Sequence, residues 1–468
     1  MKKLIYKYFL YNLRIKIIIA FLFISFYYYL LIYKLKLSSL KEDYQQIQTQ
    51  LNLNFTNNIN KKIRIGIHTV SLADGGLQRI TAILINYLDK LNIFKIYLFS
   101  LKGKEKEEYP ISDKVKRVFI EKKNDGKYLV NKIIKNKLDI FIYQIPLLNE
   151  IRALNNLKNV KVIFFIHSCF FYWLYISDFY TLKIYEEYKN SKYIISLIPF
   201  ESDYLFKKWG INSLLFENFL TYNYSFLIAS NLTSENILLI GRGRSETKRF
   251  ELAIEAMEYI LKEMSGAKLN IISRANNTDR LQYFINNLNL ENSVKFRNYS
   301  FDPSIYFRDA SLNLLTSISE SYSLVLSETK MYGIPNILLG LDYLLLAKNG
   351  TIIIHDDLPE TLAKVSMKVL YQRIYKKKLA KKARISMKIF DNENLIRKWK
   401  ILLLSAYNNV DIKQINIERD IDNRKNVYRM LKREVKLLNN RFEKYKNITI
   451  EDIENISLYN FAESLTKI

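Results

Sequence analysis

A pattern of apolar strands and amphipathic helices runs twice along the chain, and it limits the possible folds more than any other feature. The first run has strand patterns at residues 63–67, 96–101, 115–120, 140–143, 162–166, 194–197 and 214–216. The pattern then restarts, with strand patterns at residues 236–241, 268–272, 293–296, 312–315, 336–339 and 351–354. Strands that alternate with helices form parallel sheets covered by helices on both faces. The chain is therefore predicted to be an α/β protein with two doubly wound, Rossmann-like domains.

The chain length agrees with this division, because 468 residues are too many for one ordinary hydrophobic core. We predict a first domain at residues 62–232 and a second at residues 233–408. A charged tail that is helical in part follows at residues 409–468. Ligands of such domains bind at the carboxyl ends of the strands, so two domains in series predict a ligand cleft between them.

The N-terminal segment has the features of a membrane attachment. Residues 1–16 mix Lys and Arg with large apolar side chains, as expected of a basic amphipathic helix in a membrane interface. Residues 17–33 contain no charged side chain and would form a helix about 25 Å long, close to the thickness of a hydrocarbon core. A cleaved signal peptide would need small residues at its cleavage site, and residues 27–37 offer only bulky or basic ones. A core helix would have a polar face, and residues 17–33 have none. We therefore predict a membrane-anchor helix at residues 17–33, followed by a polar stalk at 34–61.

The charge balance points to a polyanionic partner. The chain has 72 Lys and Arg against 46 Asp and Glu, a net charge of +26. Nucleic acid, an anionic membrane surface and phosphate-bearing substrates all fit this excess. Nucleic acid is not expected, because the basic residues are scattered and no recognition module is evident. The single cysteine excludes an internal disulfide and a thiolate zinc site, and the three histidines are too dispersed to predict a metal site.

Residues 316–335, with the sequence TSISESYSLVLSETKMYGIP, lie where a strand pattern changes into a helix pattern. The N–H groups of Ser321, Tyr322 and Ser323 would point out of the start of that helix, where an anion is favoured. Glu320 lies at the turn, and Glu328 lies about two helical turns further on. A helix cap is the alternative for this serine-rich turn taken alone.

A basic loop with the sequence GRGRSETKR, residues 241–249, follows the first strand of the second domain. Fixed cations beside a departing diphosphate stabilise the charge that it gains. Arg and Lys both bind phosphate oxygens well. A solvated basic turn is the alternative for this loop taken alone.

The two glutamates, the apolar residues between them and the Gly-x-Pro at 333–335 resemble the donor-site motif of retaining GT-B glycosyltransferases of the family-four type, also called glycosyl transferases group 1. The resemblance covers about residues 63–399. It implies that Glu320 lies beside the donor sugar, that Glu328 binds the ribose of a nucleotide sugar, and that Arg242 and Lys248 bind the diphosphate. The family usually has Gly after the first glutamate, whereas this chain has Ser321.

The first domain has further matches to this family. Gly75 and Gly76, before a helix predicted at residues 80–91, resemble its N-terminal Gly-Gly loop, which touches the donor phosphate or the acceptor; a glutamate usually follows two residues later, where this chain has Gln78. His167 matches a histidine that contacts the donor sugar, and Asn218 an asparagine before the interdomain crossing. Residues 392–400 resemble the tryptophan-bearing closing helix. A glycine pair is most often only a turn, and a strand-end histidine is more often structural.

The resemblance implies a retaining, nucleotide-sugar-dependent glycosyltransferase, a hexosyltransferase, whose acceptor is a cell-envelope glycan or a lipid-linked sugar. No metal and no other cofactor is expected, because side chains supply the cations. The alternatives are a catalytically silent, membrane-anchored protein that binds nucleotide sugar or anionic lipid, and an inverting GT-B transferase or epimerase. A cytosolic donor predicts association with an anionic membrane surface on the cytoplasmic face of the plasma membrane. The positive-inside rule instead favours an N-terminus inside and the rest outside.

Overall fold

The computed structural model describes residues 61–73, 75–169, 179–199, 201–202, 205–206, 210–221, 227–241, 246–273, 279–297, 300, 302 and 304–410. The predicted membrane anchor, most of the stalk, Arg242 and the charged tail from residue 411 lie outside these residues. Within the described part, no helix combines the length and the apolar character that crossing a bilayer requires.

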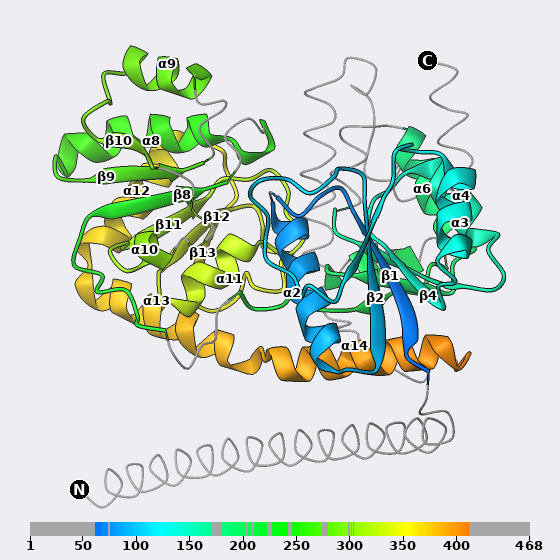
Figure 1. Cartoon of the computed structure of the whole chain (residues 1–468). Coiled ribbons are helices and arrows are strands. Elements are labelled where there is room, and N and C mark those ends of the chain that lie inside the picture. The colour runs from blue at the N-terminus through cyan, green and yellow to red at the C-terminus, as the bar shows by residue number, and fades with distance from the viewer. Residues whose placement is uncertain are drawn as a thin grey trace, which may run out of the picture. The chain divides into compact units, whose positions relative to one another are not determined.

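The first sheet has seven parallel strands in the described part of the chain, in the order β3-β2-β1-β4-β5-β6-β7. Figure 1 labels β1, β2 and β4 of this sheet. The order reverses between β1 and β4. Ile65 of β1 pairs with Ile96 of β2 on one side and with Ile140 of β4 on the other. Its strands are β1 (Ile63–Thr69), β2 (Phe94–Ser100), β3 (Lys116–Phe119), β4 (Ile140–Tyr143), β5 (Lys161–Ile166), β6 (Tyr193–Ser196) and β7 (Leu214–Leu215). The helices between them are α2 (Gly76–Lys90), α3 (Gly126–Lys135), α4 (Leu148–Asn155) and α6 (Phe179–Tyr188).

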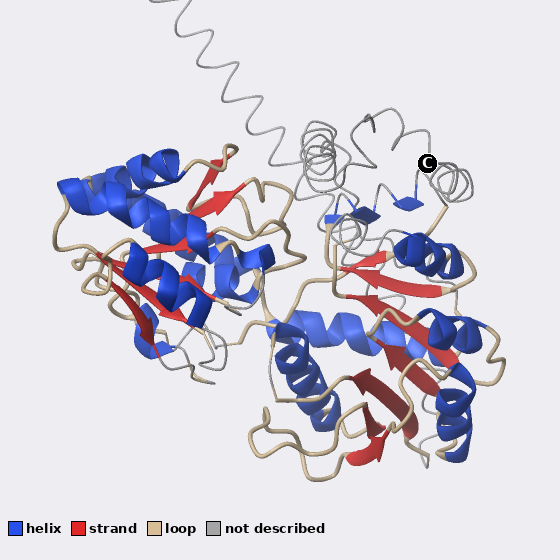
Figure 2. Ribbon diagram, turned by 90° about the horizontal axis from the view of Figure 1, so that it is seen from above, coloured by secondary structure: helices blue, strands red, loops and turns tan. Residues whose placement is uncertain are grey.

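The second sheet has six parallel strands in the described residues, in the order β10-β9-β8-β11-β12-β13. Its strands are β8 (Asn236–Ile240), β9 (Lys268–Ile272), β10 (Val294–Arg297), β11 (Leu312–Leu315), β12 (Asn336–Leu339) and β13 (Thr351–Ile354). The helical segments are η3 (Glu246–Lys248), α8 (Phe250–Glu263), α9 (Asp279–Asn287), α10 (Ser304–Phe307), α11 (Leu324–Met331), α12 (Pro359–Tyr371), α13 (Arg373–Ser386), η4 (Met387–Ile389) and α14 (Asn392–Tyr407). Figure 2 shows strands between helices in both sheets.

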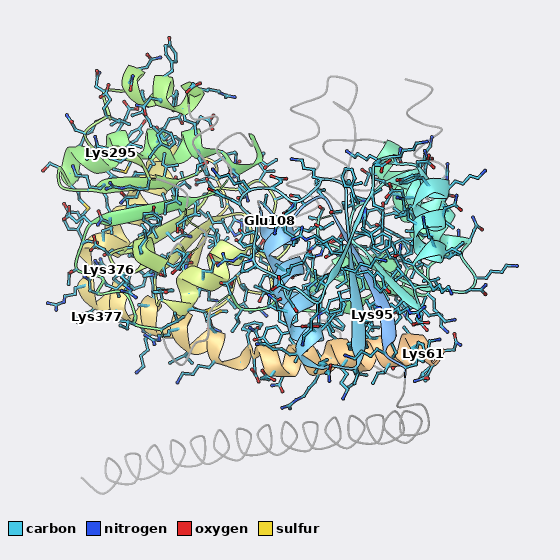
Figure 3. All side chains as sticks on the ribbon, in the orientation of Figure 1. Lys61, Lys95, Glu108, Lys295, Lys376 and Lys377 are labelled. Carbon is cyan, nitrogen blue, oxygen red and sulfur yellow. The ribbon has the colours of Figure 1, made fainter. Side chains whose placement is uncertain are left out.

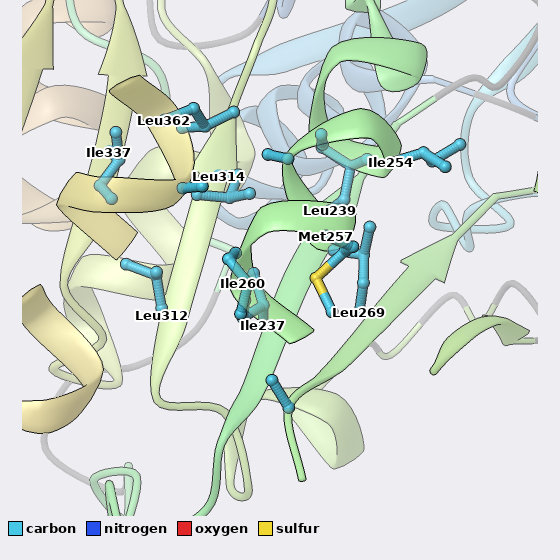
Figure 4. Packing of buried hydrophobic residues seen from close by; sticks show 14 of the residues in the cluster. Ile237, Leu239, Ile254, Met257, Ile260, Leu269, Leu312, Leu314, Ile337 and Leu362 are labelled. Carbon is cyan, nitrogen blue, oxygen red and sulfur yellow. The ribbon is translucent and has the colours of Figure 1, made fainter. Parts of the chain in front are cut away.

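The core of the second domain explains why the inner strands of its sheet are continuous apolar runs. Side chains from four strands pack against α8 and α12, and all are buried (Figure 4): Ile237, Leu239, Leu269, Leu312, Leu314, Ile337, Ile254, Met257, Ile260 and Leu362. Inner strands of a parallel sheet that is covered on both faces have no solvent-facing positions, so they do not alternate with polar residues. The edge strand β10 does alternate, and its Lys295 is exposed. Full burial of each such side chain contributes about 1.5–3 kcal/mol.

The prediction of an α/β chain with two Rossmann-like parallel sheets is confirmed, and the two sheets are separate. The helix expected from residue 80 begins earlier, at Gly76. Gly75 has a φ of 106°, which glycine adopts readily, and its carbonyl accepts the hydrogen bond from Arg79 N at 3.1 Å. The glycine pair therefore opens α2 directly after β1 and its turn.

Helix α14 follows the second sheet in the chain but packs against the first domain. Trp399 is buried, and its ring makes edge contacts with Phe165 and Phe216, at centroid distances of 5.4 and 5.2 Å. At the start of α14, the Asn392 side chain accepts from Leu220 N at 2.7 Å and donates to Leu220 O at 2.9 Å. These contacts attach α14 to the segment that leads from the first domain to the second.

Candidate donor-binding site

Helix α11 begins at Leu324, directly after the serine-rich turn that follows β11. Ser323 is its N-cap, and its Oγ accepts from Leu326 N at 3.4 Å. Ser323 has a φ of 61°, an uncommon value for a residue with a Cβ, whereas Ser321 is not among the positive-φ residues of the described part. The side chain at Ser321, where the resembled family has glycine, therefore causes no backbone strain.

Lys248 and Glu320 are in direct contact. Lys248 Nζ donates to Glu320 Oε1, and Ser317 Oγ donates to the same oxygen at 2.7 Å. The side chains of Lys248 and Glu320 are 20% and 13% exposed, so both can be reached by a ligand. The structure thus brings together the basic loop and the first glutamate, two features that the sequence separates by 72 residues.

Backbone contacts hold this pair in position. Thr316 Oγ1 donates to Lys248 O at 2.6 Å, and Ile318 N donates to Thr247 O at 2.7 Å. The buried Tyr343 hydroxyl accepts from Glu320 N and donates to Glu320 O, each at 2.9 Å. Because both segments are tied through their main chains, the positions of Lys248 and Glu320 are set before any ligand binds.

Glu328 lies on α11 and is 2% exposed. Its Oε1 accepts from Arg79 NH1 at 2.6 Å and from Thr221 Oγ1 at 2.8 Å. Burial raises the pKa of the Glu328 carboxyl above its usual value, and Arg79 and the Thr221 hydrogen bond oppose that rise. Arg79 belongs to α2 in the first domain, so this carboxylate joins the two domains.

The start of α2 lies against the start of α11. A Cβ added to Gly76 would be 3.3 Å from Leu324 Cδ1, which is a tight contact between the first residues of the two helices. The predicted glycine loop and the predicted phosphate-binding turn are therefore neighbours. Helix N-termini favour anions, and here two of them meet.

His167 follows β5, and its Nε2 lies 2.8 Å from Gln144 Oε1. The Gln144 amide nitrogen donates to His68 O at 2.9 Å and to Thr81 Oγ1 at 3.0 Å, which directs its carbonyl oxygen toward His167. Burial lowers the pKa of His167 to about 3, so the ring is neutral near pH 7. The tautomer that fits has the proton on Nε2 and leaves Nδ1 as an acceptor.

Two further predicted residues are buried. Asn218 is 7% exposed, and its Oδ1 has no hydrogen-bond partner among the described residues. Tyr322 is 1% exposed, and within the described part its hydroxyl also has none; burial raises its pKa. Buried polar atoms without partners are rare in folded proteins. Tyr322 lies in the turn that carries Glu320, and Asn218 lies in the segment that also carries Thr221, the hydrogen-bond donor to Glu328.

The side chains of the other two histidines take no part in the contacts described for this site. His68 is fully buried in β1 and stacks on Tyr143 with ring centroids 4.9 Å apart, and burial lowers its pKa to about 3. His355 follows β13 and is exposed. Over the described residues, no group of three or more His, Cys, Asp and Glu side chains could hold a metal ion.

Sequence reasoning missed several residues that shape the site: Arg79, Thr221, Gln144, Ser317 and Tyr343. A signal existed for Arg79, which lies three residues after Gly76 and so on the first turn of α2. Residues of a first turn project near the helix start, where the ligand was expected. The partners of Thr221 and Tyr343 are 107 and 23 residues away along the chain, and no local pattern indicates them.

Comparison with known proteins finds a family match in the second domain. Residues 224–386 match the family described as Glycosyl transferases group 1. This group 1 match includes η3, α11 and the Lys248–Glu320 contact. It covers the region in which the sequence resemblance is strongest.

Two curated relatives are similar to this chain over part of their lengths. An uncharacterized glycosyltransferase of Haemophilus influenzae is 24% identical over 37% of the chain and 50% of the relative. The poly(ribitol-phosphate) alpha-N-acetylglucosaminyltransferase of Staphylococcus aureus is 24% identical over 33% of the chain and 32% of the relative. The chain thus spans half or less of the curated relatives that it matches.

Solved structures show that the two-domain fold is that of GT-B glycosyltransferases. Sucrose-phosphate synthase from Thermosynechococcus elongatus has a TM-score of 0.63 and 14% identity, over 74% of this chain and all of that one. HepE from Anabaena, solved in complex with UDP and glucose, has a TM-score of 0.60 and 14% identity, over 73% of this chain and all of that one. WaaG, a glycosyltransferase involved in lipopolysaccharide biosynthesis, has a TM-score of 0.58 and 15% identity, over 73% and 99%.

Proposed function

We propose that this protein is a glycosyltransferase that moves a hexose from a nucleotide sugar to a cell-envelope glycan or a lipid-linked acceptor, with retention at the anomeric carbon. The observation that carries the proposal is the contact between Lys248 and Glu320 beside the start of α11. A cation and the N-terminus of a helix together attract a diphosphate. The carboxylate in the same place can accept hydrogen bonds from sugar hydroxyl groups.

Each residue then has a chemical role. Lys248, with Arg242 of the same loop, stabilises the negative charge on the departing diphosphate. The turn that leads into α11, at Ser321, Tyr322 and Ser323, binds phosphate or sugar through its backbone N–H groups. Because side chains neutralise this charge, the proposed reaction needs no metal ion.

Glu328 binds the ribose in this proposal. Both hydrogen bonds to its carboxylate within the described residues go to Oε1, from Arg79 and Thr221. Its Oε2 is then the oxygen that accepts from a ribose hydroxyl. Arg79 opposes the rise in the pKa of Glu328 that burial causes, and it orients the carboxylate for this contact.

The first domain completes the site. Gly75 and Gly76 let the backbone approach the donor phosphate or the acceptor, since Gly76 has no side chain between α2 and Leu324. His167 is neutral near pH 7, so its Nδ1 accepts a hydrogen bond from a donor-sugar hydroxyl. The Asn218 Oδ1, buried without a described partner, accepts another from the substrate.

The names of similar proteins support the substrate classes. HepE is solved with UDP and glucose, which fits a nucleotide-sugar donor. The Staphylococcus aureus relative is named for a poly(ribitol-phosphate) acceptor, and WaaG for lipopolysaccharide biosynthesis, which fits an envelope acceptor. We place the protein at the cytoplasmic face of the plasma membrane, where such donors are available, and propose that residues 17–33 anchor it there.

Donor turnover by the full chain tests this proposal. Nucleotide sugars are supplied one at a time with lipid-linked acceptors, and release of nucleoside diphosphate and the anomeric configuration of the product are measured. Lys248→Ala and Glu320→Gln are expected to lower turnover at least 100-fold. The matched variant Lys295→Ala, at an exposed position on β10, should leave turnover unchanged (Figure 3).

The results also separate the alternatives. A product of inverted configuration would assign an inverting transferase, and isomerised donor without transfer would assign an epimerase. Binding of the donor without turnover, in the unchanged chain and in both variants, would assign a catalytically silent binding protein.

A further inference from the structure

Helix α13 is strongly basic and has two different faces. Seven of its fourteen residues are Lys or Arg, and it contains no acidic residue. One face is buried against the second domain, through Lys376, Leu379, Ala380 and Ala383. Figure 3 labels Lys376 and Lys377 on this helix.

Two turns that contain glycine pack closely against the buried face of α13. A Cβ added to Gly350 would lie 2.4 Å from backbone atoms of Ala383, and one at Gly333 would lie 3.5 Å from Ala380 O. Arg384 donates to Leu227 O at 2.8 Å. Because the helix is attached to backbone on this side, its opposite face is fixed toward solvent.

The opposite face carries large apolar side chains that nothing in the described structure covers. Ile374 is 87% exposed, Ile385 is 51% exposed, and Ile389 of η4 is 79% exposed. The α-helical spacing between Ile374 and Ile385 places both on one side of α13, and Ile389 follows at the end of η4. Exposed lysines lie among them, at Lys377, Lys378, Lys381, Lys382 and Lys388. We call these three isoleucines and five lysines the α13 face.

We propose that the α13 face docks on an anionic lipid bilayer. The apolar side chains enter the boundary between headgroups and acyl chains, and the surrounding lysines contact anionic headgroups. A helix with basic residues beside large apolar ones, in a protein with a net charge of +26, is suited to such a surface. This surface lies outside the proposed donor site, and its lipid contact does not depend on transferase activity.

The composition of the face favours lipid over other polyanions. A single-stranded nucleic acid is bound by aromatic side chains on which bases stack, whereas the α13 face presents isoleucines. Transfer of an isoleucine side chain from water to an apolar phase lowers the free energy, and lysine ammonium groups remain with the headgroups. A bilayer with anionic headgroups offers both environments at one surface.

Docking through α13 would also bring the membrane close to α11. Gly333, which follows α11, packs on α13 at Ala380 and Arg384. Helix α11, which carries Glu328, is therefore packed next to α13, the helix that would lie on the lipid. This arrangement suits a transferase whose acceptor is held in a membrane.

A fluorescent label on the face tests the proposal in the full chain. The variant Ile389→Cys is labelled with an environment-sensitive dye; the native Cys169 is buried, and the unchanged chain serves as the labelling blank. Vesicles containing phosphatidylglycerol are expected to shift the emission to the blue and to protect the dye from iodide. Pure phosphatidylcholine vesicles or 1 M salt should abolish the change, since ionic contacts at a surface are screened.

Two matched variants provide the controls. The label at Tyr283→Cys, a 69% exposed position on α9, should not respond to either vesicle. Combined Lys378→Ser, Lys381→Ser and Lys382→Ser substitutions should lower the docked-to-free ratio reported at Ile389→Cys by about 100-fold, since each lysine near an anionic surface contributes about a factor of five.

Three results would overturn the proposal. These are an unchanged signal at Ile389→Cys with anionic vesicles, an equal response at Tyr283→Cys, and an equal response to neutral vesicles. A response to an RNA oligonucleotide alone would assign the face to nucleic acid instead. A response that rises with protein concentration in the absence of lipid would assign it to a second copy of the chain.

Discussion

Arg79 and Glu328 form a salt bridge, with 2.6 Å between Arg79 NH1 and Glu328 Oε1, although 249 residues separate them in the chain. Their side chains are 15% and 3% exposed. Arg79 lies on the first turn of α2, and Glu328 lies on α11, so the pair connects the two Rossmann-like domains. The same carboxylate is the proposed ribose ligand.

A double-mutant cycle on this pair should show strong coupling. Arg79→Met leaves a buried carboxylate without its cation, and Glu328→Gln leaves a partly buried guanidinium without its anion. We expect a coupling of about 1–3 kcal/mol in the free energy of unfolding, measured by urea denaturation of the two single variants and the double variant. Unfolding free energies that add within about 0.5 kcal/mol would contradict a functional pairing of these groups.

Lys330 should make the stability depend on pH. It is 1% exposed, and its Nζ donates to Leu346 O at 2.8 Å and to Lys348 O at 2.7 Å. Burial lowers its pKa to about 7 from an ordinary value of 10.5, so the unfolded chain binds more protons than the folded chain between these two values. The stabilising contribution is complete above pH 10.5 and is lost as the pH falls through 7.

The measurement compares the unchanged chain with Lys330→Met at pH 7, 8 and 9. Relative to the variant, the unfolding free energy of the unchanged chain should rise with pH by at most about 1.4 kcal/mol per pH unit. Parallel pH profiles for the two chains would refute the argument from burial.

Trp399 should be a major contributor to stability. It is 1% exposed and lies between Phe165 and Phe216 of the first domain. Trp399→Ala should lower the unfolding free energy by about 3–5 kcal/mol, as large-to-small changes at buried aromatic sites do. Tyr407→Ala at a 40% exposed position of the same helix should change it by less than about 0.5 kcal/mol. Similar losses from the two changes would be inconsistent with the packing of α14.

Ser323 should respond differently to alanine and to glycine. Alanine removes the cap on α11 and retains the strained φ of 61°, so Ser323→Ala should cost about 1 kcal/mol. Ser323→Gly loses the cap but relieves the strain, and it should be about 1 kcal/mol more stable than Ser323→Ala. Thermal unfolding compares the stabilities of the two variants. An alanine variant at least as stable as the glycine variant would argue against backbone strain at this position.

The sheets could be predicted from the sequence because their strands are buried on both faces. Strands β9, β11, β12 and β13 begin and end where the apolar runs do. Every position of β11 and β12 is buried, and four of the five in β9 are, whereas the edge strand β13 is mostly half-buried. The start of α2 was harder to predict, because a glycine pair fits a turn as well as a helix start. In the structure, Gly75 has a φ of 106° and is the N-cap of α2, so the glycine pair is a helix start.

The candidate site could be predicted only where its residues belong to local motifs. The turn from Glu320 to Ser323 is local and was identified, whereas the Arg79–Glu328 pair depends on how two domains meet. Lys330 illustrates a second limit, since lysine is rarely buried and a sequence pattern predicts it to be exposed. The amide orientation of Gln144, and with it the tautomer of His167, follows from contacts that only coordinates show.

The most direct test of the central claim is calorimetric titration of UDP into the full chain and into Lys248→Ala, with Lys295→Ala as the control. A charged hydrogen bond contributes about 1.5–3 kcal/mol, so the loss of Lys248 should weaken UDP binding by roughly 10- to 150-fold. Lys295→Ala should bind UDP as the unchanged chain does. Equal affinity of the unchanged chain and Lys248→Ala for UDP would contradict the assignment of the Lys248–Glu320 pair to the donor diphosphate.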